Sequence, residues 1–212
     1  MPLPSEPASD AAAERTRTRE FFAVRAADWE RRFPDDGPRY QAAVTDLGLR
    51  PGQRVLDAGC GTGRALPPLR HAVGPSGTVL GLDLTPEMLQ QAARAGRSGL
   101  AVLAVADCAR LPLPDGALDA VFAAGLIAHL PGPLAALTEL ARVVRPGGRL
   151  ALFHPVGRAA LAARHGRALT PDDLRAEPNL RPLLAAAGWR LTSYLDTDER
   201  FLALADRPAD RQ

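Results

Sequence analysis

An acid and three glycines at alternate positions stand in the stretch VLDAGCGTGRALPPL. Asp57 ends a hydrophobic run, and Gly59, Gly61 and Gly63 keep side chains off the turn that follows, so a ligand can lie against the backbone. A phosphate-binding P-loop needs a Lys after its last glycine, and none is present. The dinucleotide fingerprint needs a glycine where this turn has Arg64. The turn therefore predicts a ligand without phosphate groups and with a cation near Asp57.

Further acids, a thiol and histidines are expected at the ends of the later strands. One hydrophobic stretch ends in Asp83, the next in Asp107 and Cys108, and another in His154, while His129 follows the fourth predicted strand. Ligands of open α/β sheets bind at the carboxyl ends of the strands, so these groups are predicted to surround one pocket. His129 and His154 are the candidate catalytic bases, because an imidazole can take a proton near neutral pH.

Strand and helix patterns alternate from residue 54 onward, which is typical of a parallel α/β sheet covered by helices on both faces. Strands are predicted at 54–59, 78–83, 100–107, 118–124, 149–154, 188–195 and 200–205. Helices are predicted from the glycine turn to 73, from 86 to 95, from 133 to the PGG turn, and over 156–187. The last two strands are joined by only four residues, too few for a parallel crossover. The expected fold is a seven-stranded, mostly parallel sheet with one antiparallel strand near the edge.

Four sequence blocks resemble the class I S-adenosylmethionine-dependent methyltransferases. VLDAGCGTGR is similar to the first motif of that family, and GLDLTPEML places an acid at the end of the second strand. AVADCARLPLPDGALDAVFA resembles the adenine-side motif, and LARVVRPGGRLAL resembles the helix, turn and fifth strand. The blocks follow the family's order between about residues 40 and 205. The resemblance implies a Rossmann-like three-layer sandwich and S-adenosyl-L-methionine as the cofactor.

The resemblance also implies roles for single residues. Asp57 and the glycine backbone would hold the methionine end of the cofactor, and Asp83 would accept from the two ribose hydroxyls. Asp107 would accept from the adenine amino group, and the Cys108 N–H would reach a ring nitrogen. The expected cofactor-binding set is Tyr40, Asp57, Gly59, Cys60, Gly61, Gly63, Asp83, Leu84, Asp107, Cys108 and Ala124.

Structural roles remain open for several of these residues. The glycines can form a tight turn without a ligand, Asp83 and Asp107 can be surface or loop acids, and Cys60 and Cys108 can be small buried fillers. The aromatic-rich segment 21–40, which contains Phe33 and Tyr40, covers the cofactor mouth, packs a helix on the sheet, or does both. Two prolines at 67 and 68 predict a late or kinked start of the helix after the glycines.

The implied activity is transfer of a methyl group from S-adenosylmethionine to a small-molecule acceptor by in-line displacement. Alignment of donor and acceptor does most of this work, and a base is needed only for an acidic acceptor. The alternative is a catalytically inactive binding or regulatory protein on the same fold. Arg64 disfavours a nicotinamide-dependent reductase, and a nucleic-acid methyltransferase lacks a supporting basic run or Asn-Pro-Pro-aromatic motif. No residue pattern indicates a metal site.

Composition is that of an ordinary globular protein: 212 residues, 46% hydrophobic, 24% charged, with a net charge of +2. All 26 basic residues are Arg, which excludes a lysine Schiff base. No apolar run reaches the roughly 20 residues of a membrane span, and the polar start lacks an export signal. We expect a disordered leader over 1–18, a helical cap over 19–50 and a cofactor-binding domain over 51–206. We also expect a cytoplasmic protein without nucleic-acid or membrane partners, its oligomeric state left open.

Overall fold

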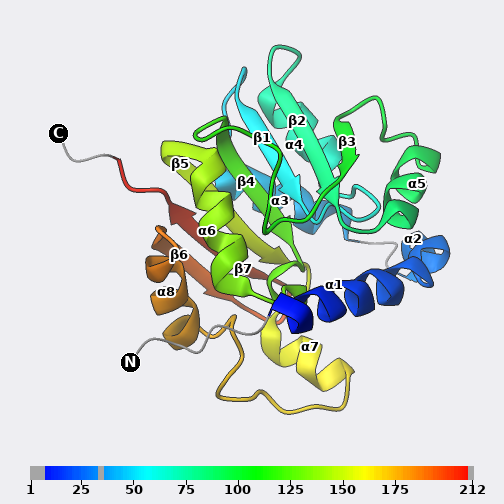
Figure 1. The fold of residues 1–212 in the computed structure, drawn as a ribbon, viewed down its shortest axis with the longest axis vertical. Coiled ribbons are helices and arrows are strands. Elements are labelled where there is room, and N and C mark those ends of the chain that lie inside the picture. The colour runs from blue at the N-terminus through cyan, green and yellow to red at the C-terminus, as the bar shows by residue number, and fades with distance from the viewer. Residues whose placement is uncertain (1–7, 33–35, 210–212) are drawn as a thin grey trace.

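One sheet of seven strands forms the centre of the computed structural model, which describes residues 8–32 and 36–209 (Figure 1). The strands are β1 Arg54–Ala58, β2 Thr78–Asp83, β3 Val102–Val105, β4 Leu118–Ala124, β5 Val144–His154, β6 Arg190–Asp196 and β7 Phe201–Asp206. Their order across the sheet is β3-β2-β1-β4-β5-β7-β6. The first five pair in parallel, whereas β7 runs antiparallel to both β5 and β6. The predicted sheet with one reversed strand near its edge is confirmed.

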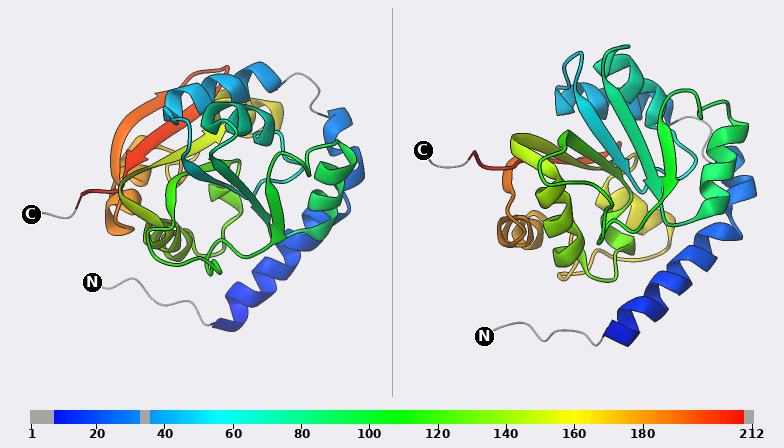
Figure 2. Two further views of the ribbon diagram at one scale, coloured as in Figure 1. Left: turned by 90° about the horizontal axis from the view of Figure 1, so that it is seen from above. Right: turned by 45° about the horizontal axis from the view of Figure 1, so that its top comes forward.

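Helices cover both faces of this sheet, which makes three layers (Figure 2). On one face α3 (Gly37–Leu47) and α4 (Leu66–Val73) pack into a buried hydrophobic cluster with β1, β4 and β5. On the other face α6 (Pro133–Val143) and α8 (Glu177–Ala186) pack into a second cluster. The helix α5 (Pro86–Arg94) packs beside β2 and β3. The remaining helical elements are α1 Ala8–Ala23, η1 Ala26–Asp28, α2 Trp29–Arg32, η2 Ile127–His129 and α7 Arg158–Arg164.

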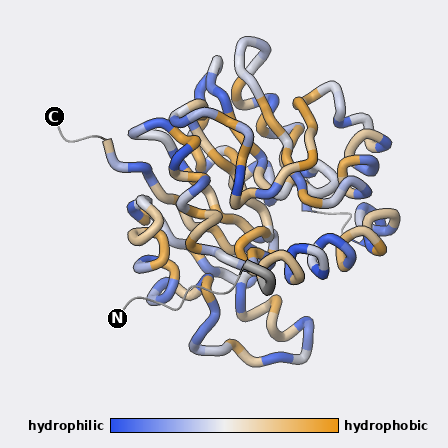
Figure 3. Tube along the Cα trace, in the orientation of Figure 1, coloured by the Kyte–Doolittle hydropathy of each residue, from blue (hydrophilic) through white to orange (hydrophobic). Residues whose placement is uncertain are grey.

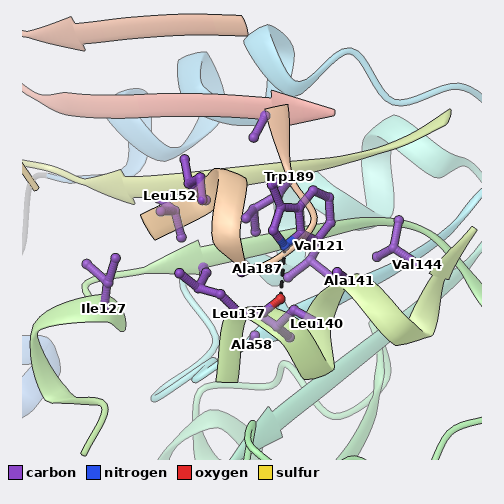
Figure 4. Packing of buried hydrophobic residues seen from close by; sticks show 14 of the residues in the cluster. Ala58, Val121, Ile127, Leu137, Leu140, Ala141, Val144, Leu152, Ala187 and Trp189 are labelled. Atoms are coloured by element: carbon purple, nitrogen blue, oxygen red, sulfur yellow. Dashed lines mark hydrogen bonds between the residues drawn. The ribbon is translucent and has the colours of Figure 1, made fainter. Parts of the chain in front are cut away.

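Trp189 anchors α8 and β6 to the second cluster. Its side chain is only 2% exposed, and its indole N–H donates to the Leu137 carbonyl at 2.9 Å, which satisfies the one polar group of the ring (Figure 4). Leu137 and Leu140 lie three positions apart on α6 and are fully buried beside it. Figure 3 shows hydrophobic residues along the central strands, whereas α1 mixes polar and apolar residues. The core therefore lies on the sheet, and α1 lies outside it.

The structure corrects several sequence expectations. Residues 8–18 are not a disordered leader, because α1 is helical from Ala8, so the N-terminal cap begins earlier than predicted; residues 1–7 lie outside the described part. The helix predicted over 156–187 is two helices, α7 and α8, separated by a loop. The edge strand β3 is shorter than predicted and largely exposed, because only β2 pairs with it. The helix α4 begins late, at Leu66, with the two prolines in its first turn, as predicted.

Candidate functional site

The glycine turn after β1 has left-handed backbone at all three glycines. The φ angles of Gly59, Gly61 and Gly63 are 67°, 55° and 81°, a region that side chains disfavour. A Cβ on Gly59 would lie 2.9 Å from the Leu126 side chain, and one on Gly63 would lie 2.7 Å from Leu66. Beside Gly61 there is open space. Two of the glycines therefore allow close packing of the turn, and Gly61 leaves room for a ligand.

A pocket of about 890 Å³ opens at the carboxyl ends of the central strands. Its lining includes these predicted site residues: Tyr40, Asp57, Gly59, Cys60, Gly61, Asp83, Leu84, Cys108, Ala124, His129 and His154. Gly63 and Asp107 are not in the lining. The helix α1 and the segment after β5 supply further walls, so residues far apart in the sequence enclose one space.

Asp57 has no protein partner although it is buried. It is 1% exposed, and neither carboxylate oxygen has a hydrogen bond within the described residues. Burial, and then the charge of Asp83, raise the pKa of Asp57 to about 8. A buried carboxylate without a partner costs free energy, which a cationic or hydrogen-bond-donating ligand would recover. The site is therefore suited to an ammonium group.

Asp83 connects the glycine turn to the start of α5. One carboxylate oxygen accepts from the Gly61 N–H at 2.8 Å, and the other accepts from the Thr85 N–H at 2.8 Å. Burial raises the pKa of Asp83, and these two N–H groups partly offset that effect. A carboxylate has about four acceptor positions, so Asp83 can hold the turn and still accept from two hydroxyls.

Asp107 lies outside the pocket lining and has protein partners of its own. Its carboxylate accepts from the Ala109 N–H at 2.9 Å and lies 3.5 Å from the Arg15 guanidinium of α1. Its predicted contact with adenine stays a prediction. Cys60 and Cys108 are both buried, and burial raises the pKa of each thiol, that of Cys108 to about 12. Both thiols are therefore neutral near pH 7, as small buried fillers are.

His154 is held in one orientation at the end of β5. Its Nδ1 lies 2.7 Å from the Val156 carbonyl oxygen and 3.1 Å from the Val156 N–H. In the tautomer whose Nδ1–H donates to this carbonyl, the Nε2 lone pair is a proton acceptor. Burial lowers the pKa of His154 to about 4, against the effect of this hydrogen bond and with help from Arg175. The imidazole is therefore neutral at pH 7.

His129 connects η2 to the cap. Its ring lies 5.0 Å from the Phe22 ring and 6.5 Å from the Phe21 ring, measured between centroids. Burial, and then the charge of Arg175, lower the pKa of His129. Both predicted bases thus face the same pocket in their neutral forms, and a catalytic role for either stays a prediction.

Tyr40 belongs to the sheet and to the pocket. Its ring lies 5.0 Å from that of Phe153 and 6.3 Å from that of Phe122, and the residue lines the pocket. Burial, and then the charge of Asp57, raise the pKa of its hydroxyl. Tyr40 therefore both packs on the sheet and lines the pocket, so both interpretations of segment 21–40 apply to this residue. Phe33, in the same segment, lies outside the described residues.

An ionic cluster around Glu30 fastens the cap to the glycine turn, and the sequence analysis missed it. Glu30 accepts from Arg97 at 3.0 and 3.1 Å, from Arg64 at 3.3 Å, and from the Thr62 hydroxyl. Arg64 also reaches Asp36 at 3.2 Å. Burial alone would raise the pKa of Glu30, but the Arg97 and Thr62 hydrogen bonds and the arginine charges lower it to about 2. No spacing could reveal this cluster, because its members are brought together only by folding.

The segment after β5 supplies basic residues that the sequence analysis did not place in the site. Arg164, Arg167 and Arg175 line the pocket, together with His165. The signal in the sequence was the short stretch RHGR at 164–167, where two arginines flank a histidine.

No helix in the described part of the chain is long and apolar enough to cross a membrane. Among the same residues, no group of three or more His, Cys, Asp or Glu gathers as a metal site would require.

Comparison with known proteins gives consistent matches. A family model described as a methyltransferase domain matches residues 56–152. This chain is 41% identical to nocamycin O-methyltransferase of Saccharothrix syringae over 110 residues, which are 50% of the chain. It is also 42% identical to an uncharacterized 37.1 kDa protein of transposon TN4556 from Streptomyces fradiae over 123 residues, which are 57% of the chain. The matches span only 39% and 36% of those two relatives. A solved S-adenosylmethionine-dependent methyltransferase from Aquifex aeolicus is 28% identical with a TM-score of 0.67, covering 79% of this chain and 89% of that one.

Proposed function

We propose that this chain, which contains a class I S-adenosylmethionine-dependent methyltransferase domain, transfers the methyl group of its cofactor to a small-molecule acceptor. The observation that carries the proposal is Asp57, a buried carboxylate in the pocket lining with no partner among the described residues. The cofactor offers an ammonium group and no phosphate. Both properties suit a turn that has an acid before it and no lysine after it.

Each part of the cofactor has a matching group in the pocket. Asp57 would pair with the ammonium of the methionine end, beside the backbone of Gly59 and Gly61. Asp83 would accept from the ribose hydroxyls with the acceptor positions that the turn leaves unused. The lining residues Leu84, Cys108 and Ala124 would pack against the remainder.

The cofactor supplies a methyl group on a sulfonium, which becomes a neutral thioether when the methyl leaves. The protein therefore has no developing anion to stabilise on the leaving group. Its work is to exclude water and align the acceptor in line, which is worth up to roughly 7–11 kcal/mol. For an acidic acceptor, the free Nε2 of His154 is the proton acceptor we propose, with His129 as the second candidate.

Two observations support a small acceptor. The pocket is enclosed by α1, η2 and the segment after β5, and its volume is at the upper end of the roughly 300–1,000 Å³ of small-molecule sites. Nocamycin O-methyltransferase, by its name, acts on a small molecule. In this proposal the protein acts in the cytoplasm and without nucleic acid.

Calorimetry tests cofactor binding directly. We expect S-adenosylhomocysteine to bind the wild-type chain and NAD not to bind. Asp57→Asn should abolish measurable binding, while Asp198→Asn, an exposed acid outside the pocket, should leave it unchanged. Binding of NAD alone, or full S-adenosylhomocysteine affinity in Asp57→Asn, would contradict the proposal.

A screen of small-molecule acceptors, coupled to homocysteine release, separates an enzyme from an inactive binding protein. Turnover that requires both the acceptor and the intact Asp57 supports the enzyme. Tight binding of S-adenosylhomocysteine without turnover on any acceptor favours the regulatory alternative.

A further inference from the structure

The pocket has a second half, which the cofactor residues do not occupy. We use the name cofactor half for Asp57, Gly59, Cys60, Gly61, Asp83 and Leu84, and acceptor half for Phe21, Phe22, Arg25, His129, His154, Arg164, Arg167 and Arg175, all in the pocket lining. The acceptor half comes from α1 and the turn after it, η2, the end of β5, α7 and the loop after α7. Figure 1 shows α1 and α7 at the lower end of the molecule.

Basic groups outnumber acids in the acceptor half. Arg164 and Arg167 have no acidic partner within residues 8–32 and 36–209. The acid that lines this part of the pocket is Asp173, and it is already held by Arg158 at 3.0 Å and by Arg175 at 3.2 Å. Net positive charge therefore remains on this wall.

The acids elsewhere in the lining do not cancel this charge. Asp36 is engaged by Arg64 at 3.2 Å, and Asp57 and Asp83 belong to the cofactor half. The charges of Arg175 and Arg164 reach the imidazoles, since both of them lower the pKa of His154 and Arg175 lowers that of His129.

Elsewhere on the surface, Arg142 pairs with Glu139 at 2.8 Å and Arg181 pairs with Glu177 at 2.6 Å, whereas the exposed Arg94 and Arg110 form no ion pair within the described residues. Arg164 and Arg167 are exposed too, and their place in the pocket lining is what distinguishes them. A guanidinium is suited to bind carboxylate or phosphate oxygens in a bidentate manner.

Apolar side chains lie beside these charges. Phe21 is 46% exposed and Leu169 is 44% exposed, and both line the pocket, as do Phe22, Trp29 and Leu161. The Arg25 guanidinium lies 3.6 Å from the centre of the Phe21 ring. Large apolar groups left open toward a pocket indicate a ligand with an apolar body.

We infer that the acceptor is a small organic anion, with a carboxylate or phosphate group held by Arg164, Arg167 and Arg175 and an apolar body against the cap aromatics. This inference rests on the proposed function, because it assigns the substrate class of the same pocket. The anionic group neutralises the arginine wall, and the cap aromatics cover the rest of the molecule.

Binding of three matched probes tests the inference on the full chain saturated with S-adenosylhomocysteine. The probes are 2-naphthoate, 2-naphthyl phosphate and the neutral 2-naphthamide, measured by calorimetry at 50 mM and 500 mM NaCl. We expect at least one anion to bind ten or more times more tightly than the amide, and to weaken at high salt. Whether naphthoate or naphthyl phosphate binds more tightly distinguishes a carboxylate from a phosphate.

A double variant locates the charge. Arg164→Gln combined with Arg167→Gln should lower the affinity for the preferred anion about tenfold. The affinity for S-adenosylhomocysteine should stay within twofold of wild type. The matched control is Arg94→Gln with Arg110→Gln, two exposed arginines outside the pocket, which should change neither. Melting temperatures of both double variants verify that they fold.

The results separate the two claims. Equal affinity for anions and amide, no binding of either anion, or an unaffected double variant would overturn the inference while S-adenosylhomocysteine still binds. A single-stranded 20-mer DNA that binds more tightly than both naphthyl anions would overturn it in favour of nucleic acid. Loss of S-adenosylhomocysteine binding by the wild-type chain would instead overturn the proposed function.

Discussion

The cofactor half and the acceptor half of the pocket carry opposite charges and are built in different ways. The cofactor half presents Asp57 and Asp83 from the ends of adjacent buried strands, with backbone N–H groups holding the turn between them. The acceptor half presents arginines and histidines from helices and loops outside the sheet, and α7 has no buried residue. A rigid sheet edge can thus hold a constant ligand, while loops set what is placed opposite it.

Replacing Asp57 has the largest expected effect, and on the cofactor half alone. In Asp57→Asn the ammonium loses its charged partner, and breaking such a buried pair costs about 3–5 kcal/mol, a hundredfold or more in affinity. Calorimetry with S-adenosylhomocysteine measures this.

In the absence of ligand, the same variant should be more stable than wild type at high pH. The pKa of Asp57 is raised to about 8, so the folded protein binds the proton more tightly than the unfolded chain, and stability is lost as the pH rises from about 4 to 8. Asp57→Asn should therefore melt higher than wild type at pH 8.5. A lower melting temperature there would show that Asp57 has a partner in the free protein.

Asp83→Ala should weaken the binding of S-adenosylhomocysteine by about 1.5–3 kcal/mol, which is a roughly 10- to 150-fold loss of affinity. The loss combines the ribose hydrogen bonds with the freed N–H of Gly61. Calorimetry with adenosine separates them, since adenosine has no methionine end. Unchanged affinity for both ligands would remove Asp83 from the site.

His154→Gln should affect the acceptor half and leave the cofactor half intact. The pKa of His154 is lowered to about 4, so the unfolded chain takes up a proton before the folded one as the pH falls below about 6.5. Wild type should then lose about 1–2 kcal/mol more stability than the variant between pH 7 and pH 5. Urea unfolding at both pH values measures the difference, and S-adenosylhomocysteine affinity at pH 7 should not change.

Glu30→Gln is expected to have the smallest effect, because the cluster is partly exposed. Losing its charge should lower the melting temperature by about 2–4 °C, the effect of roughly 1 kcal/mol in a chain of this size. The folded pKa is about 2, so the difference from wild type should shrink as the pH falls below about 4.5. The control is Glu87→Gln, an exposed acid on α5. An equal change in both variants would mean that the cluster does not fasten the cap.

Local pattern was enough to predict most of the sheet and much of the cofactor half. Short apolar runs in the sequence coincide with β1, β2 and β4, and the turn after β1 needs glycine wherever φ is positive. The errors lie where local pattern is ambiguous. The alanine- and arginine-rich start predicts a disordered leader, whereas α1 is helical, and the pattern over 156–187 predicts one helix where the structure has α7 and α8.

The sequence by itself determined the order of the strands along the chain, the acids at their ends and the absence of a phosphate-binding lysine, because periodicity and turn chemistry are local properties. Only the tertiary structure decided that Asp57 has no partner among the described residues, that Glu30 meets Arg97, and that Arg164 and His154 line the same pocket. These facts depend on burial and on contacts between distant segments. No spacing along the chain encodes them, since they arise when the cap and the segment after β5 close over the sheet edge.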